Sequence, residues 1–103
     1  MQLTGFHTIL KGLLLSVLLY VAACETAPPV QEMSDARQAI AVAKEAGAAE
    51  HAAFHLKAAE DYLESAQQAL NERHYSEARR DAKQAKMKAL DALEASETSD
   101  EDK

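Results

Sequence analysis

The apolar residues of this 103-residue chain fall into one continuous run and three periodic stripes. The run covers residues 13–24 (LLLSVLLYVAAC). After it, small and apolar residues recur at alternating spacings of three and four, which is the spacing of one face of an α-helix. The stripes are Ala36, Ile40, Ala43 and Gly47, then Ala52, Leu56, Ala59, Leu63, Ala66 and Leu70, then Tyr75, Ala78, Ala82, Ala85, Ala89 and Ala92. The pattern predicts an all-α protein.

The first two stripes cannot belong to one straight helix. They are offset by two residues, which is a rotation of about 200° at ~100° per residue. We therefore predict that the chain breaks near Gly47–His51, with Gly47 ending the first helix, because glycine is favoured at helix C-termini. Ser34 is the predicted N-cap of that helix.

The second and third stripes predict an antiparallel helical hairpin. The polar segment 71–74 (NERH) between them is short, and a short connection makes consecutive helices antiparallel neighbours. Ser76 is the predicted cap of the last helix. Leucines on one helix facing alanines on the other form a large-to-small match that allows close packing. We expect any surface for a protein partner to be the exposed part of this alanine seam.

These patterns divide the chain into four segments. Residues 1–23 are predicted to be a signal peptide, 24–33 a lipidated cysteine and tether, 34–96 the helical domain, and 97–103 a disordered acidic tail. Pro28 and Pro29 favour extended backbone in the tether, which would reach roughly 25–30 Å at ~3.1 Å per residue.

The apolar run has the features of an export signal. It is about a dozen residues long, whereas a membrane-spanning helix needs ~20, and extending it would bury Lys11. Its last residues (VAAC) resemble the lipobox of bacterial lipoproteins. That resemblance implies cleavage between Ala23 and Cys24, lipid attachment at Cys24, and a body that faces the periplasm. Glu25 stands where aspartate is typical of inner-membrane retention, so the resemblance favours the outer membrane. An ordinary signal peptide, giving a freely secreted small helical protein, is the alternative interpretation.

The helical part is similar to a known family. The features are Ala36-Arg37-x-Ala39-Ile40, Ala46-Gly47-Ala48, the alanine-rich stretch 58–70, and Tyr75-x-Glu77-Ala78 with Ala82. They resemble the bacterial envelope lipoproteins grouped as domain-of-unknown-function family 4398. The resemblance implies a short helix followed by a helical hairpin.

The charge balance restricts the partners. The formal net charge is −6, and removal of residues 1–23 takes away Lys11 and no acidic residue, so the remainder stands at −7. An acidic body argues against nucleic acid, whose binding depends on Lys and Arg. Because the core is thin, we expect self-association or docking on another helical protein. One cluster of basic residues stands out: Arg79, Arg80, Lys83, Lys86 and Lys88. It predicts an anionic partner. The alternative interpretation is a solvated helix face whose basic residues pair with nearby acids.

The remaining candidates for chemistry are few. His51 and His55 are four residues apart and would share a helix face, so they could supply two ligands of a zinc site. A zinc site needs three or four ligands, and His74 would lie about 28 Å farther along a helix. We predict no metal, no cofactor and no catalytic residues. Lys103 ends the chain, as a terminal lysine does in murein lipoproteins, to which the anchor and composition are similar. That resemblance implies a second hypothesis, covalent attachment of Lys103 to peptidoglycan.

Overall fold

Helices make up most of the part of the chain that the computed structural model describes, which is residues 2–25 and 27–101, with side chains for 4–17 and 27–101. The predicted all-α class is confirmed. In order, the elements are α1 (Gln2–Glu25), α2 (Val30–Glu45), α3 (Ala48–His51), α4 (Ala53–Asn71) and α5 (Tyr75–Glu101).

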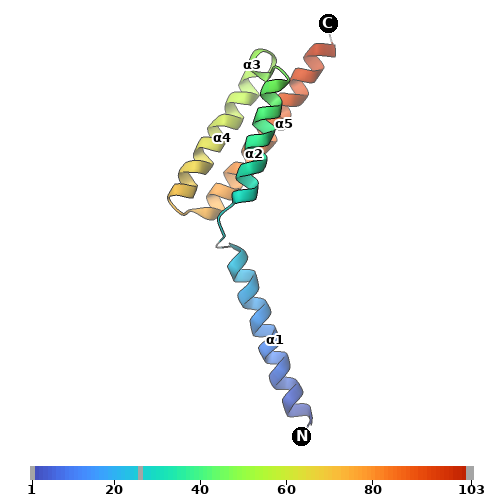
Figure 1. Ribbon diagram of the computed structural model, residues 1–103, viewed down its shortest axis with the longest axis vertical. Coiled ribbons are helices and arrows are strands. Elements are labelled where there is room, and N and C mark those ends of the chain that lie inside the picture. The colour runs from blue at the N-terminus through green and yellow to red at the C-terminus, as the bar shows by residue number, and fades with distance from the viewer. Residues whose placement is uncertain (1, 26, 102–103) are drawn as a thin grey trace.

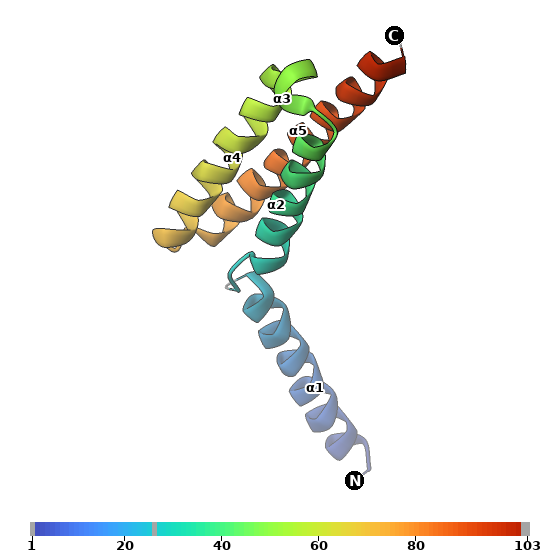
Figure 2. The same cartoon turned by 45° about the horizontal axis from the view of Figure 1, so that its top comes forward.

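Helices α2, α4 and α5 form an elongated bundle, and α1 extends away from it (Figures 1 and 2). Helices α4 and α5 make the predicted antiparallel hairpin, and α5 also packs against α2. In the part of α1 whose side chains the structure describes, residues 4–17, the large apolar side chains are exposed, from Phe6 at 63% to Val17 at 58%. No helix in the described part of the chain combines the length and apolar character needed to cross a membrane.

The alanine seam of α5 is the centre of the bundle. All five of its alanines are fully buried, which confirms the third stripe: Ala78, Ala82, Ala85, Ala89 and Ala92. Ile40 of α2 and Leu56 of α4 belong to one core cluster with Ala89 and Ala92. Leu63 packs against both this cluster and a second one that contains Met33. Side chains as small as alanine let the helices approach closely, and the larger residues fill the space that remains.

The break between the first two stripes lies where the sequence places it. Helix α2 ends at Glu45, and Gly47 follows with φ 87°, a left-handed conformation that glycine adopts without steric penalty. The Gly47 N–H donates to the carbonyl of Lys44 at 3.0 Å. One helical turn, α3, then carries the chain into α4, and this turn was not predicted.

The two predicted N-caps are wrong. Helix α2 begins at Val30, so Ser34 lies inside it, and α5 begins at Tyr75, so Ser76 is its second residue. The turn between α4 and α5 is instead stabilised by backbone hydrogen bonds at the C-terminus of α4. Arg73 takes φ 63°, and the His74 N–H donates to the Ala69 carbonyl at 2.8 Å. These are features of a Schellman motif, with arginine at the position that glycine usually holds.

The predicted disordered tail is also wrong for residues 97–101. Helix α5 continues to Glu101 without a break. Ser96 is fully buried and its hydroxyl donates to the Ala92 carbonyl at 2.8 Å. Farther along, Ser99 Oγ lies 3.3 Å from His51 Nδ1. The end of α5 is therefore attached to the bundle by packing and by this contact with α3.

Candidate functional site

The end of the bundle nearest α1 is a joint where three parts of the chain meet. Pro29 precedes α2 and its side chain is fully buried. The Val30 N–H donates to the Pro28 carbonyl at 2.9 Å, and the Met33 N–H to the Pro29 carbonyl at 3.0 Å. Proline before a helix restricts φ to a helix-compatible value and has no N–H to leave unpaired. The backbone is thus fixed from Pro28 onward.

Arg79 of α5 fastens this joint to the bundle. Its Nη2 donates to the Ala27 carbonyl at 3.0 Å, and its Nε donates to Glu32 Oε1 at 3.2 Å. The two side chains are 24% and 28% exposed, so the ion pair is partly shielded from water. A guanidinium can hold two acceptors at once because its donors are arranged in a rigid fork. Arg79 therefore positions the chain entering the bundle.

Cys24 lies just before this joint, in the last turn of α1. The side chains of Ala23 and Cys24 are outside the described residues. From Ala27 onward the chain contacts the bundle, so the predicted free tether over residues 24–33 is too long. Only Glu25 and Thr26 separate Cys24 from the residue that Arg79 holds.

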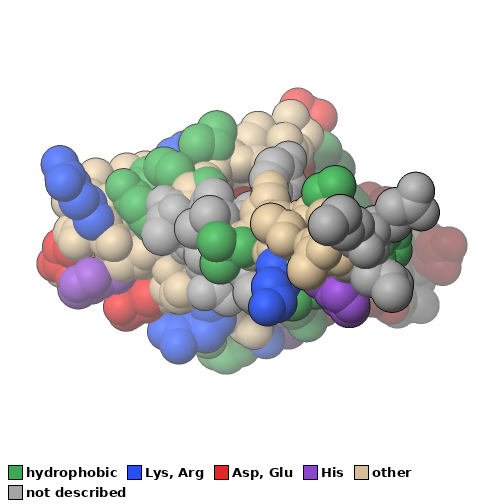
Figure 3. All heavy atoms as spheres, turned by 90° about the horizontal axis from the view of Figure 1, so that it is seen from below, with side chains coloured by type: hydrophobic (Ala, Val, Ile, Leu, Met, Phe, Trp, Pro, Cys, Tyr) green, Lys and Arg blue, Asp and Glu red, His purple; other side chains and the backbone are tan. Residues whose placement is uncertain are grey.

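Three of the five residues in the basic cluster of α5 lie close to an acidic side chain. Arg79 is engaged at the joint, Arg80 Nε lies 3.6 Å from Asp81 Oδ1, and Lys88 Nζ lies 3.8 Å from Asp91 Oδ2. Lys83 and Lys86 are exposed. Seen from below, the end of the molecule shows Lys and Arg side chains that lie apart from one another among hydrophobic, acidic and histidine side chains (Figure 3). These pairings match the interpretation of a solvated face with nearby acids.

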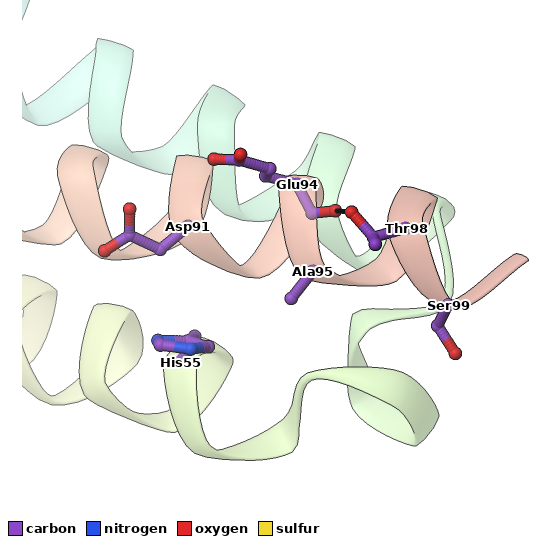
Figure 4. Close-up of a pocket in the computed structure, with 6 residues that line it drawn as sticks. All are labelled: His55, Asp91, Glu94, Ala95, Thr98 and Ser99. Carbon is purple, nitrogen blue, oxygen red and sulfur yellow. Dashed lines mark hydrogen bonds between the residues drawn. The ribbon is translucent and has the colours of Figure 1, made fainter. Parts of the chain in front are cut away.

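An open groove of about 570 Å³ lies between α4 and α5 at the opposite end of the bundle. His55 of α4 faces α5 across it, toward Asp91 and Ala95 (Figure 4). His55 Nδ1 is buried without a hydrogen-bond partner among the described residues. His51 turns toward Ser99 instead of joining His55. In the part of the chain that the structure describes, no three His, Cys, Asp or Glu side chains are grouped to hold a metal ion.

Two other candidates lie at opposite ends of the hairpin. His74 is in the α4–α5 connection, where its Nδ1 is 3.4 Å from Glu72 and 3.7 Å from Glu77. It is therefore separated from His51 and His55 by the length of α4. Lys103, the residue of the peptidoglycan hypothesis, lies outside the described residues.

The alanine seam, which we expected to offer a partner surface, is instead closed within the bundle. Its α5 alanines are fully buried between α2 and α4. One buried carboxylate interrupts this interface: Asp81, 7% exposed, accepts a hydrogen bond from Ser65 Oγ of α4 at 2.7 Å. No local sequence pattern indicates this pair, because Ser65 and Asp81 are on different helices.

A family model described as a domain of unknown function, DUF4398, matches residues 31–103. The chain belongs to the DUF4398 family. The match begins at the second residue of α2, so the DUF4398 unit is the bundle and α1 lies outside it. Comparison with curated proteins and with solved structures finds no match for the chain.

Proposed function

We propose that this DUF4398 protein is a lipid-anchored, periplasm-facing lipoprotein of a bacterial cell envelope. In this proposal Cys24 is the acylated first residue, after cleavage between Ala23 and Cys24. The bundle then serves as a structural or protein-interaction module without enzymatic activity. The outer membrane is favoured over the inner one because glutamate, rather than aspartate, follows the cysteine.

The position of Cys24 carries the proposal. It is the only cysteine of the chain, and it stands between an apolar helix whose described side chains, residues 4–17, are exposed and a bundle engaged from Ala27. Exposed leucines on such a helix suit a segment that enters a membrane and is then removed. Two or three acyl chains at Cys24 would anchor the bundle firmly, at ~0.8 kcal/mol per buried methylene.

The short link to the anchor supports a specific placement. Three residues, Cys24 to Thr26, reach at most about 10 Å at ~3.3–3.6 Å each. The bundle would therefore stay against the membrane surface, not at the roughly 25–30 Å expected for the predicted tether.

The test is metabolic labelling and fractionation of the full chain in a Gram-negative host. Wild-type chain is expected to incorporate labelled palmitate and to stay with membranes after carbonate washing. Cys24→Ser should lose the label and remain unprocessed or leave the membrane. Ser16→Ala, in the same apolar run, is the matched control and should behave as wild type. A Cys24→Ser chain that keeps its label would refute the anchor, and a soluble, unlabelled wild type would show a freely secreted protein.

A peptidoglycan staple is a second candidate, favoured by the direction of α5. This helix starts at the joint near the anchor and ends at Glu101 on the opposite end of the bundle (Figure 1). Its 27 residues span about 40 Å at 1.5 Å per residue. Lys103 would thus be carried away from the membrane. Muramidase should release the chain with sugar-peptide attached, and deletion of Lys103 should abolish that product; identical behaviour of both chains would exclude the staple.

A further inference from the structure

The outward face of α5 carries a second helical stripe, distinct from the buried alanine seam. Its members are spaced alternately by three and four residues and all are exposed. We call it the outer strip: Arg80, Lys83, Met87, Leu90, Glu94 and Glu97. Met87 is 57% exposed and Leu90 47%, so two large apolar side chains stand together in water at its centre.

The two halves of the outer strip carry opposite charges. The basic residues Arg80 and Lys83 precede the apolar pair, and the acidic residues Glu94 and Glu97 follow it at the same distances. A twofold axis between Met87 and Leu90 would place Arg80 opposite Glu97 of a second copy and Lys83 opposite Glu94. Met87 would meet Leu90 of that copy, which covers both apolar side chains. Parallel pairing would instead set Arg80 against Arg80, so charge selects the antiparallel orientation.

We propose that the outer strip of α5 is a self-association surface, on which two copies of this chain pair antiparallel about the Met87–Leu90 pair. The paired stretch from Arg80 to Glu97 is about 26 Å long at 1.5 Å per residue, which makes a small interface. We therefore expect a dissociation constant in the micromolar range or weaker. Ion pairs in such an exposed interface are screened by salt, so the dimer should weaken as ionic strength rises.

This inference uses the proposed function in one respect only. Anchoring at Cys24 would concentrate the copies on one membrane and favour a weak dimer. The pairing itself depends on α5, so it can be measured whether or not the chain is acylated. Failure of the anchor and failure of the dimer are thus separate results.

The test is sedimentation equilibrium of the full chain in a density-matched neutral detergent, with charge-reversal variants. Glu94→Lys with Glu97→Lys should weaken the dimer about tenfold or more, because two ion pairs and their twofold copies become repulsive. Arg80→Glu with Lys83→Glu should do the same. Combining all four substitutions restores opposite charges across the axis and should return the affinity to within about threefold of wild type.

The matched control is Glu45→Lys with Glu64→Lys, the same charge change at exposed positions of α2 and α4. It should leave the dimer unchanged, and circular dichroism should show equal helix content in every variant. A wild type that stays monomeric at all concentrations overturns the proposal. So does a fourfold variant that remains as weak as the double variants, or a control that weakens as much as they do.

Discussion

The close packing of the alanine seam makes Ala89→Leu a strongly destabilising change. Ala89 is fully buried and shares a core cluster with Ile40 and Leu56. Leucine at this position must push the neighbouring helices apart or take a strained rotamer. Its helix propensity is close to that of alanine, so the effect reports packing and not helix formation.

The magnitude follows from the size of the bundle. Overpacking of a well-packed core destabilises by ~1–3 kcal/mol. A domain of about 75 residues has a total stability of roughly 4–11 kcal/mol at ~0.05–0.15 kcal/mol per residue. For a domain of this size 1 kcal/mol shifts the melting temperature by ~4–8 °C, so Ala89→Leu should lower it by roughly 5–20 °C.

The assay is thermal unfolding of residues 24–103, followed by circular dichroism, with Cys24→Ser to remove the reactive thiol. Ala41→Leu is the control, because Ala41 is exposed on α2 and the chemical change is the same. It should alter stability by no more than ~0.5 kcal/mol. Equal melting temperatures for Ala89→Leu and Ala41→Leu would refute the close packing of the seam.

Four further substitutions test other contacts and the two left-handed positions, with urea unfolding for the first three and amide exchange for the last. Ser65→Ala removes the hydrogen bond to the buried Asp81 carboxylate and should destabilise by ~1–3 kcal/mol in urea unfolding; no change would mean that water replaces the hydroxyl. Gly47 and Arg73 both have positive φ, which glycine adopts more easily than other residues. Gly47→Ala should therefore lower the free energy of unfolding by about 1 kcal/mol, and Arg73→Gly should raise it by about 0.5–1 kcal/mol. A change of the same sign in both variants would contradict this reasoning. Arg79→Met should speed amide exchange at Val30 while Leu56 stays protected; equal loss of protection at both amides would show that Arg79 supports the whole bundle.

The helices and their buried faces could be predicted from the sequence because they depend on local periodicity. The three-and-four spacing of alanines from Ala78 to Ala92 is read directly from the chain, and each is buried. The phase shift at Gly47 likewise needs only the geometry of one helix. Such signals depend only on residues that are close in the sequence, so they can be interpreted without knowledge of the tertiary structure.

At both ends of the bundle, local start and stop signals of the helices agree with the structure better than composition does. Pro28 and Pro29 suggested an extended tether, yet proline also marks helix starts, and here its burial fixes the start of α2. The polar segment after Glu94 suggested disorder. It contains no proline or glycine, and adding residues to an existing helix is far easier than nucleating one.

The joint could not be predicted from the sequence, whereas the outer strip could be predicted in part. Arg79 contacts Glu32 and Ala27, which are 47 and 52 residues away, and no local pattern reports such pairs. The outer strip follows a visible spacing, but only the structure shows that Met87 and Leu90 are exposed on it.

The central claim is that Cys24 becomes the lipid-bearing first residue of the mature protein. Mass spectrometry of the N-terminal peptide from membrane-extracted native chain tests it most directly. The account predicts a peptide that begins at Cys24 and carries two or three acyl chains. A peptide that begins elsewhere, or an unmodified Cys24, would contradict it.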